Sequence, residues 1–375
     1  MLHRQRGTRH GVLHNERIPS KARSILTTTN YSRLLPGVPL IESPFFAKIV
    51  PELGLDEETR RIAFELHLFG YSVIDFPEPN FDELAESTKS ALIGRFDWDW
   101  WIKQGHQEGT GMRAWDAWKD VESIRRIAAN ARIIELLSTL YGRKAWPFQT
   151  LNFPVGTQQH IHTDAVHFHS NPERFMCGVW VAMEDVTVDN GPLAYYPGSH
   201  KWPVYTNEHI GYCVSDHPQR PSQAIYEEMW QGLIEAHHAQ PQVFLCKKGQ
   251  ALIWAANLLH GGCLQRDKHQ TRWSQVTHYF FDDCAYYTPM WSDPFHGRVY
   301  FRRPINVVSG QTEKHAYVGH DLPARFVSDS MNGYHDFDAA LYLEANPDVA
   351  AAGTDPLAHY LTFGIKELRR IRPPG

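Results

Sequence analysis

The sequence predicts an α+β protein with a mainly β core, flanked by helices and followed by a small C-terminal helical module. Short β-rich runs dominate residues 146–281, and turn signals such as Asp189-Asn190-Gly191-Pro192 separate several of them. Helical spacing of apolar residues precedes this region and returns after it. Many short strands with few helices between them favour a closed or sandwiched antiparallel sheet, and a jelly roll is one such form that can shelter a metal.

Composition bounds the architecture and the class of partner. The chain has 375 residues, of which 42% are hydrophobic, with 12 Trp, 16 Tyr and 19 Phe. These values are typical of a folded globular protein, and we expect one main domain with appendages. The formal net charge of -5 gives no overall basic field, so we expect no nucleic-acid partner.

The cysteine pattern and the hydropathy of the sequence indicate in which cellular compartment the protein is expected. The 5 Cys are scattered and form no C-x-x-C pair, which argues against a disulfide framework and against a cysteine zinc site. No apolar run approaches the ~20 residues of a membrane span, and the N-terminus lacks the apolar core of a signal peptide. We therefore expect a cytoplasmic protein with no membrane span.

Residues 1–45 are expected to form a basic, flexible tail. Up to Arg33 they hold seven Arg or Lys against one acid, Glu16, with little apolar periodicity. The alternative is an arm for an anionic partner or a targeting peptide.

The main domain is expected over 46–310 and opens with helices. Apolar residues recur at helical spacing over 56–69, and Gly70 ends this helix. Further elements are expected as a strand at 71–76, helices at 81–93 and 124–141, and β-rich runs at 148–154, 176–183, 193–196, 242–246, 250–254 and 273–281.

A tryptophan-rich segment lies between the second and third helices. Five Trp occur between residues 98 and 118, mixed with Asp, Arg and Gly, which favours a loop with an aromatic wall over a core helix. The alternative is that these rings plug one end of a sheet. We expect the substrate-facing wall to include Trp115 and Trp118, with Tyr195 and His200 from the stretch 195–200.

Residues 331–375 are expected to form the helical module. Helical patterns occupy 338–347 and 355–361, and a polar, turn-rich stretch over 309–330 joins them to the core.

The best candidate for a metal site is His162-Thr163-Asp164. In an extended segment the side chains at positions i and i+2 point to the same face, so the imidazole and the carboxylate can converge. A third ligand is expected from His260, which follows the strand at 250–254. Two histidines and one carboxylate leave open positions that suit oxygen activation, which favours iron(II) over zinc or manganese. The histidines that could replace His162 are His160, His167 and His169.

A cation for a keto acid is expected from Arg272, at the start of the last β-rich run. Ser274 lies two residues further on, so it shares the face of Arg272 and can hydrogen-bond the same carboxylate. Arg266 is the competing arginine, but it sits in a polar loop where a solvated role is expected.

Two longer stretches extend these motifs. They are Gly156-Thr-Gln-Gln-His-Ile-His-Thr-Asp164 and Asp189-Asn-Gly-Pro-Leu-Ala-Tyr-Tyr-Pro-Gly-Ser-His200. With His260 followed by Arg272, they make residues 64–281 resemble the phytanoyl-CoA dioxygenase family of iron(II)- and 2-oxoglutarate-dependent oxygenases.

The resemblance implies a double-stranded β-helix, the cupin-like form of the jelly roll. It also implies His162, Asp164 and His260 as iron ligands and Arg272 as the 2-oxoglutarate anchor. Gln149 and Asn152 are similar to polar residues that touch this co-substrate in some members. Where some members have a hydroxyl two residues after the distal histidine, this chain has Gly262, and Ser274 is expected to supply that hydrogen bond instead.

The implied reaction uses iron(II), 2-oxoglutarate and O2 and releases succinate and CO2. We expect hydroxylation of an unactivated C–H bond in a small-molecule, lipid or glycan-related substrate. Related halogenases lose the carboxylate ligand, whereas Asp164 is present here. The C-terminal module resembles a short module appended to bacterial glycosyltransferases and surface-associated proteins, which hints at glycan-related metabolism.

Two other functions fit the same residues. One is a zinc or manganese jelly-roll hydrolase or isomerase in which Arg272 binds a carboxylate of the substrate. The other is a non-catalytic jelly roll that binds a glycan through its aromatic side chains.

Overall fold

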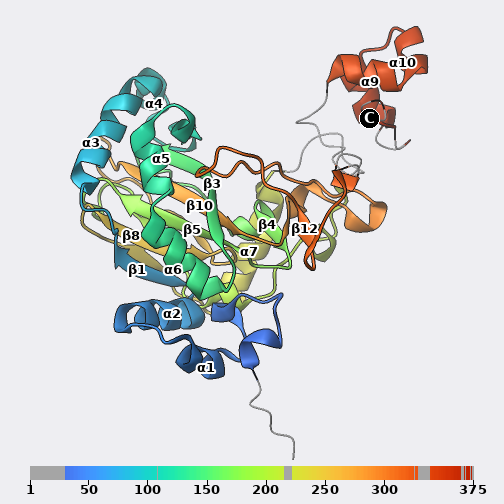
Figure 1. Ribbon diagram of the computed structural model, residues 1–375. Helices are drawn as coiled ribbons and strands as arrows, with labels where there is room; N and C mark the ends of the chain where they lie inside the picture. The colour runs from blue at the N-terminus through green and yellow to red at the C-terminus, as the bar shows by residue number, and fades with distance from the viewer. Residues whose placement is uncertain are drawn as a thin grey trace, which may run out of the picture.

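The computed structural model describes residues 30–107, 109–214, 222–324, 326–327 and 338–364, together with 367, 369–371 and 373. These residues form helices and antiparallel sheets, which confirms the expected α+β architecture (Figure 1). Most of the basic segment expected to be a tail lies before residue 30, outside the described residues.

The largest sheet among the described residues is antiparallel and has six strands. Its strand order is β1-β8-β5-β10-β3-β2, so neighbours in the sheet come from distant parts of the chain. The strands are β1 (Tyr71–Asp75), β2 (Ala114–Trp115), β3 (Ala145–Phe153), β5 (Met176–Ala182), β8 (Gln250–Ala255) and β10 (Ser274–Phe281). Every residue of β3, β5 and β10 is buried, because other elements cover both faces of the sheet.

Helices pack in the main hydrophobic cluster together with strands of this sheet (Figure 1). They are α1 (Phe46–Ile49), α2 (Glu57–Phe69), α3 (Phe81–Leu92), α4 (Trp98–Lys103), α5 (Glu122–Ala128) and α6 (Ala131–Tyr141). The helix expected over 124–141 is two helices, because the Asn130 side chain accepts hydrogen bonds from the backbone N–H groups of Arg132 and Ile133 and starts α6 anew. No helix in the described part of the chain is both long enough and apolar enough to cross a membrane.

A smaller antiparallel sheet and one helix cover the opposite face. The sheet has the order β7-β6-β9, formed by β6 (Leu193–Tyr195), β7 (Gln242–Phe244) and β9 (His260–Gly262). A second hydrophobic cluster joins the two sheets, with Leu193 and Phe244 packing in the same cluster as Trp180 and Leu252 of the large sheet. Helix α7 (Ala224–Ala236), which the sequence did not predict, packs in a third cluster around Trp230.

Shorter elements complete the main domain. Strands β4 (His169–Asn171) and β11 (Ala285–Tyr287) pair with each other, as do β12 (Ala316–Tyr317) and β13 (His320–Asp321). The backbone N–H of Ala316 donates to the carbonyl of Cys284, so the domain continues beyond the expected boundary at 310.

The N-terminal boundary also differs from the expected one at residue 45. Ile41 is buried in the main hydrophobic cluster, and the Glu42 carboxylate lies 2.6 Å from the Arg174 guanidinium. A Cβ added at Gly142 would lie 2.8 Å from the Leu40 side chain, which shows how closely this segment packs on the end of α6. Residues 30–45 are therefore part of the folded domain.

The C-terminal region contains α9 (Ala339–Ala345), α10 (Pro347–Ala351) and α11 (Pro356–His359), followed by a π-helical turn (Tyr360–Gly364). Four buried side chains form a hydrophobic cluster of their own, namely Tyr342, Val349, Tyr360 and Ile371.

Candidate metal centre

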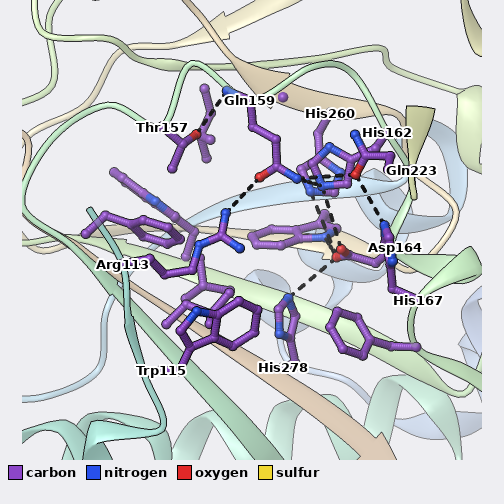
Figure 2. A pocket seen from close by; sticks show the side chains of 18 of the residues that line it. Arg113, Trp115, Thr157, Gln159, His162, Asp164, His167, Gln223, His260 and His278 are labelled. Atoms are coloured by element: carbon purple, nitrogen blue, oxygen red, sulfur yellow. Dashed lines mark hydrogen bonds and ion pairs between the residues drawn. The ribbon is translucent and has the colours of Figure 1, made fainter. Parts of the chain in front are cut away.

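His162, Asp164 and His260 come together as a buried cluster (Figure 2). One ligand atom from each side chain lies within 4.8 Å of the other two. His162 Nε2 is 4.0 Å from Asp164 Oδ1, and His260 Nε2 is 3.9 Å from Asp164 Oδ2. Among the described residues, this is the one group of three or more such side chains that can hold a metal ion.

The local backbone differs from the extended segment that the sequence predicted around His162. His162 forms a single antiparallel bridge with His260, in which each backbone N–H donates to the other carbonyl at 2.9 Å. Asp164 then starts a 3-10 helical turn (Asp164–Val166). The two side chains still converge, but the bridge to β9 positions His162 beside His260.

Backbone carbonyls orient both imidazoles. His162 Nδ1 lies 2.8 Å from the carbonyl of His160, and His260 Nδ1 lies 2.9 Å from the carbonyl of Leu258. A carbonyl only accepts hydrogen bonds, so each Nδ1 carries the proton and each Nε2 keeps its lone pair. Both lone pairs therefore face the Asp164 carboxylate, as metal ligation requires.

Two glycines let β9 pass close to the loop that carries His162. A Cβ at Gly261 would lie 2.8 Å from the carbonyl oxygen of Gln159, and a Cβ at Gly262 would lie 2.7 Å from the backbone nitrogen of Gln158. Larger residues at these positions would push the two histidine-bearing segments apart.

The protonation states of the cluster suit a metal ion. Burial lowers the pKa of His162 to about 3, and interaction with His260 lowers it further. Burial raises the pKa of Asp164, but interactions with His260, His278, His162 and the Trp254 N–H outweigh this effect and lower that pKa to about 2. Asp164 is therefore ionised and His162 neutral at pH 7, which are the forms that bind metals.

Arg272 is a buried cation in the same cavity. Its Nη1 donates to Ser274 Oγ at 3.4 Å and its Nη2 to the carbonyl of Val155 at 3.3 Å, while its Cζ lies 5.2 Å from the centre of the Trp180 ring. Burial lowers its pKa to about 10, so the side chain stays charged at pH 7. Within the described residues no carboxylate forms an ion pair with Arg272, and a buried guanidinium of this kind fits an anionic ligand.

The cluster and Arg272 line one cavity of about 270 Å³. Its walls are mainly aromatic and aliphatic, with Trp115 on one side. The other lining residues are Arg113, Leu151, Phe153, Thr157, Gln159, His167, Phe168, Trp180, Leu193, Gln223, Trp254, Gly261, Val276 and His278.

Part of the sequence matches a known protein family. The family described as phytanoyl-CoA dioxygenase (PhyH) matches residues 97–264, a segment that includes all three members of the cluster. Over this segment the chain is similar to phytanoyl-CoA dioxygenases. Arg272 lies beyond the matched residues.

Individual relatives are distant. The peroxisomal phytanoyl-CoA dioxygenase of Rattus norvegicus is 26% identical over 173 residues, which cover 44% of this chain and 48% of the relative. A probable phytanoyl-CoA dioxygenase of Caenorhabditis elegans is 26% identical over 133 residues, covering 35% of this chain and 39% of the relative. The chain thus spans half or less of the curated relatives that it matches.

Solved structures are also similar to this chain. The epimerase SnoN in complex with Fe3+, alpha ketoglutarate and nogalamycin RO has a TM-score of 0.47 and 18% identity, over 71% of this chain and 96% of that one. EctD from S. alaskensis with 2-oxoglutarate and 5-hydroxyectoine has a TM-score of 0.45 and 19% identity, over 73% of this chain and 83% of that one.

Three residues expected on the substrate wall do not line the cavity. Trp118 is only 7% exposed and packs in the main hydrophobic cluster. Tyr195 is buried between the two sheets, with its ring 4.4 Å from that of Tyr71. His200 is buried, and its Nε2 lies 3.3 Å from the carbonyl of His67. Trp115 lines the cavity.

The two polar residues of β3 point to opposite faces of the sheet. Asn152 faces the helices, where its amide donates to Gln275 Oε1 at 3.2 Å and Gln275 in turn donates to a carbonyl of α5. This position takes Asn152 away from the cavity and contradicts its expected contact with the co-substrate. Gln149 lies on the cavity side, where its Oε1 is 3.1 Å from Nδ1 of His278, but it does not line the cavity itself.

The three other histidines near His162 differ in their burial and in their contacts. His160 is exposed, and His169 is buried with its ring against Tyr287. His167 lines the cavity, and its Nε2 lies 3.2 Å from Gln223 Oε1. None of the three belongs to the metal-ligand cluster.

Several cavity residues were missed from the sequence. His278 Nε2 lies 3.6 Å from Asp164 Oδ2, and the Trp254 indole N–H donates to the same oxygen at 2.8 Å. Arg113 Nη2 donates to Gln159 Oε1 at 3.2 Å (Figure 2). Strand alternation carried a signal for His278, because it shares a face of β10 with Ser274.

Proposed function

We propose that the chain is an iron(II)- and 2-oxoglutarate-dependent oxygenase that hydroxylates an unactivated C–H bond of a small-molecule, lipid or glycan-related substrate and releases succinate and CO2. The observation that carries this proposal is the pairing, in one cavity, of a buried His-Asp-His cluster with the buried cation Arg272. The first fits a metal with open positions, and the second fits the carboxylate of a keto acid.

His162 and His260 would hold iron(II) through Nε2, and Asp164 would hold it through its carboxylate. The donor set fits this metal, because two imidazoles and one carboxylate leave about three of six positions open. When bound, iron(II) with 2-oxoglutarate and O2 supplies the oxidising chemistry. The carbonyls behind His162 and His260 keep both rings in the orientation and tautomer that this binding needs.

Arg272 would bind the far carboxylate of 2-oxoglutarate, and Ser274 would add a hydrogen bond from its hydroxyl. Arg272 Nη1 and Ser274 Oγ are 3.4 Å apart, so both side chains could donate hydrogen bonds to the same carboxylate. The Trp180 ring below the guanidinium holds the arginine in place and keeps water from it. Gln149 would act through His278 rather than on the co-substrate directly.

The substrate would enter along the wall formed by Trp115, Arg113 and Gln159. Arg113 Cζ lies 5.0 Å from the Trp115 ring, and Gln159 Nε2 lies 3.4 Å from His162 Nε2. These side chains therefore reach from the exposed edge of the cavity to the metal-facing side of the cluster. The apolar lining excludes water from the reacting carbon.

We propose the double-stranded β-helix as the finer description of the fold. The facing sheets, the antiparallel crossover order and the cavity between them support it.

We also propose three parts: a basic N-terminal segment before residue 30, an oxygenase domain that extends to at least residue 324, and the C-terminal helical module. All five cysteines are free, which supports a reducing compartment such as the cytoplasm.

Anaerobic titration tests this function. Iron(II) and then 2-oxoglutarate are added to the protein, and the metal-to-keto-acid charge-transfer absorption band is recorded. We expect the band to appear with iron(II) and to be absent with zinc. Succinate release after admission of O2 should follow. A protein that binds zinc tightly, shows no band with iron(II) and forms no succinate would instead be a hydrolase or a binding module.

A further inference from the structure

We propose that Trp254 is a positioning residue for the metal centre, and that Gly178 is present to make room for it. This inference rests on the proposed function, since it concerns the carboxylate that would bind the metal. It assigns a role to two residues that lie outside the ligand motif.

The indole of Trp254 fixes the rotation of the Asp164 carboxylate. Its Nε1–H donates to Oδ2 at 2.8 Å, in a site where both side chains are buried. Among the described residues, this is the one hydrogen bond made to the Asp164 side chain by another side chain. A carboxylate on a short side chain rotates easily, so a single buried donor decides which edge faces the imidazoles.

The same indole also contacts two of the imidazoles. Its ring centre is 5.0 Å from that of His260, in a tilted arrangement, and 6.3 Å from that of His278, edge to face. Trp254 thus touches two of the three candidate ligands, Asp164 and His260. Rigid aromatic packing of this kind limits the rotamers that both ligands can adopt.

Gly178 explains how the indole reaches Asp164. Gly178 on β5 is paired with Trp254 on β8, so both residues face the cavity side of the sheet. A Cβ at Gly178 would lie 2.2 Å from Cζ2 and 2.3 Å from Cε2 of the indole, and Cε2 is bonded to the donor nitrogen. Any side chain at 178 would therefore move the N–H away from Asp164.

The test uses Trp254→Phe, which removes the N–H, and Gly178→Ala, which displaces it. Gly232→Ala in helix α7 is the matched control, because a Cβ there meets nothing within 4 Å. Two quantities are measured under anaerobic conditions: the dissociation constant for iron(II) alone, and the wavelength of the charge-transfer band after 2-oxoglutarate is added. Circular dichroism verifies that each variant is folded.

We expect Trp254→Phe and Gly178→Ala each to weaken iron(II) binding about 10- to 100-fold and to shift the band, while Gly232→Ala changes neither. The double variant should bind iron(II) about as well as Trp254→Phe alone, because no indole N–H remains for the added Cβ to displace.

A folded Trp254→Phe or Gly178→Ala variant that keeps the wild-type affinity and the wild-type band would overturn the inference. Additive losses in the double variant would also overturn it, since they would separate Gly178 from Trp254. If the wild-type protein itself gives no band, the proposed function fails, and this result is distinct from either of the others.

Discussion

Arg272 is a charged side chain that is buried without a carboxylate partner among the described residues. Its guanidinium is buried, its pKa is lowered to about 10 by burial, and its two hydrogen bonds go to a hydroxyl and a carbonyl. Burying a charge in this way destabilises the fold unless an anion completes the site. The burial of the Arg272 guanidinium is explained if 2-oxoglutarate provides that anion.

Replacing Arg272 by Gln should therefore weaken 2-oxoglutarate binding without lowering the free energy of unfolding. We expect the dissociation constant for 2-oxoglutarate to rise at least about 10-fold, since hydrogen bonds to charged groups contribute roughly 1.5–3 kcal/mol. The free energy of unfolding in the absence of ligand should not fall, because an unpaired buried charge is removed. Isothermal titration and urea denaturation measure the two effects.

Arg266→Gln is the control for this change, since Arg266 is exposed and lies in a nearby loop. Equal 2-oxoglutarate affinity in wild type and Arg272→Gln would show that the anchor lies elsewhere.

The residue types of the site could be predicted, but their contacts could not. His162, Asp164 and His260 were marked by motif and spacing, and the structure brings them together. Asn152 was misplaced because it is three residues from Gln149, and an odd separation in a strand puts two side chains on opposite faces. Trp254 carried no sequence signal, because its partner Gly178 is 76 residues away in the chain.

At the scale of elements, capping residues decide where helices begin. Asn130 Oδ1 accepts from the backbone N–H groups of Arg132 and Ile133, and its amide donates to the carbonyl of Pro77. The apolar periodicity over 124–141 is continuous, so periodicity alone could not reveal the break between α5 and α6. An N-cap residue inside an apolar repeat was the missing signal.

Asn130→Ala should lower the free energy of unfolding by about 1–2 kcal/mol, through loss of the cap of α6 and of the bond to Pro77. Asn80→Ala is the matched control, because Asn80 precedes α3 without a side-chain cap bond. Urea denaturation measures both variants. A loss of the same size at Asn80 would contradict the capping explanation.

Two tryptophans in or near β2, Trp115 and Trp118, lie in different environments. Trp115 lines the cavity and is 55% exposed, whereas Trp118 is buried in the main cluster. We expect Trp118→Ala to cost about 3–5 kcal/mol of unfolding free energy and Trp115→Ala less than about 1 kcal/mol. Trp115→Ala should instead reduce turnover of substrate.

Denaturation curves and a screen of substrate-stimulated 2-oxoglutarate consumption distinguish the two variants. If Trp115→Ala leaves substrate turnover unchanged, the proposed wall is wrong.

At the scale of the whole molecule, one sheet separates two cores. Helices α3, α5 and α6 pack on one face, and the β7-β6-β9 sheet packs on the other and encloses the cavity. The α+β class could be predicted from alternating periods along the chain. The strand order could not, because β1 pairs with β8 across roughly half the chain and local patterns do not encode such pairing.

The N-terminal segment adds to this architecture. A protein that begins at residue 46 would lack Ile41 and the Glu42 partner of Arg174, so it should be less stable by at least about 3 kcal/mol than one that begins at residue 30. Chemical denaturation compares the two. Equal midpoints would show that residues 30–45 contribute nothing to the fold.

Iron(II)-dependent release of succinate from 2-oxoglutarate by wild type, Asp164→Ala and His160→Ala tests whether the His-Asp-His cluster is the catalytic metal site. We expect release by the wild-type protein, none above background by Asp164→Ala, and most of the wild-type rate by His160→Ala, since His160 is exposed and outside the cluster. Succinate release by Asp164→Ala at the wild-type rate, or loss of release in His160→Ala alone, would contradict it.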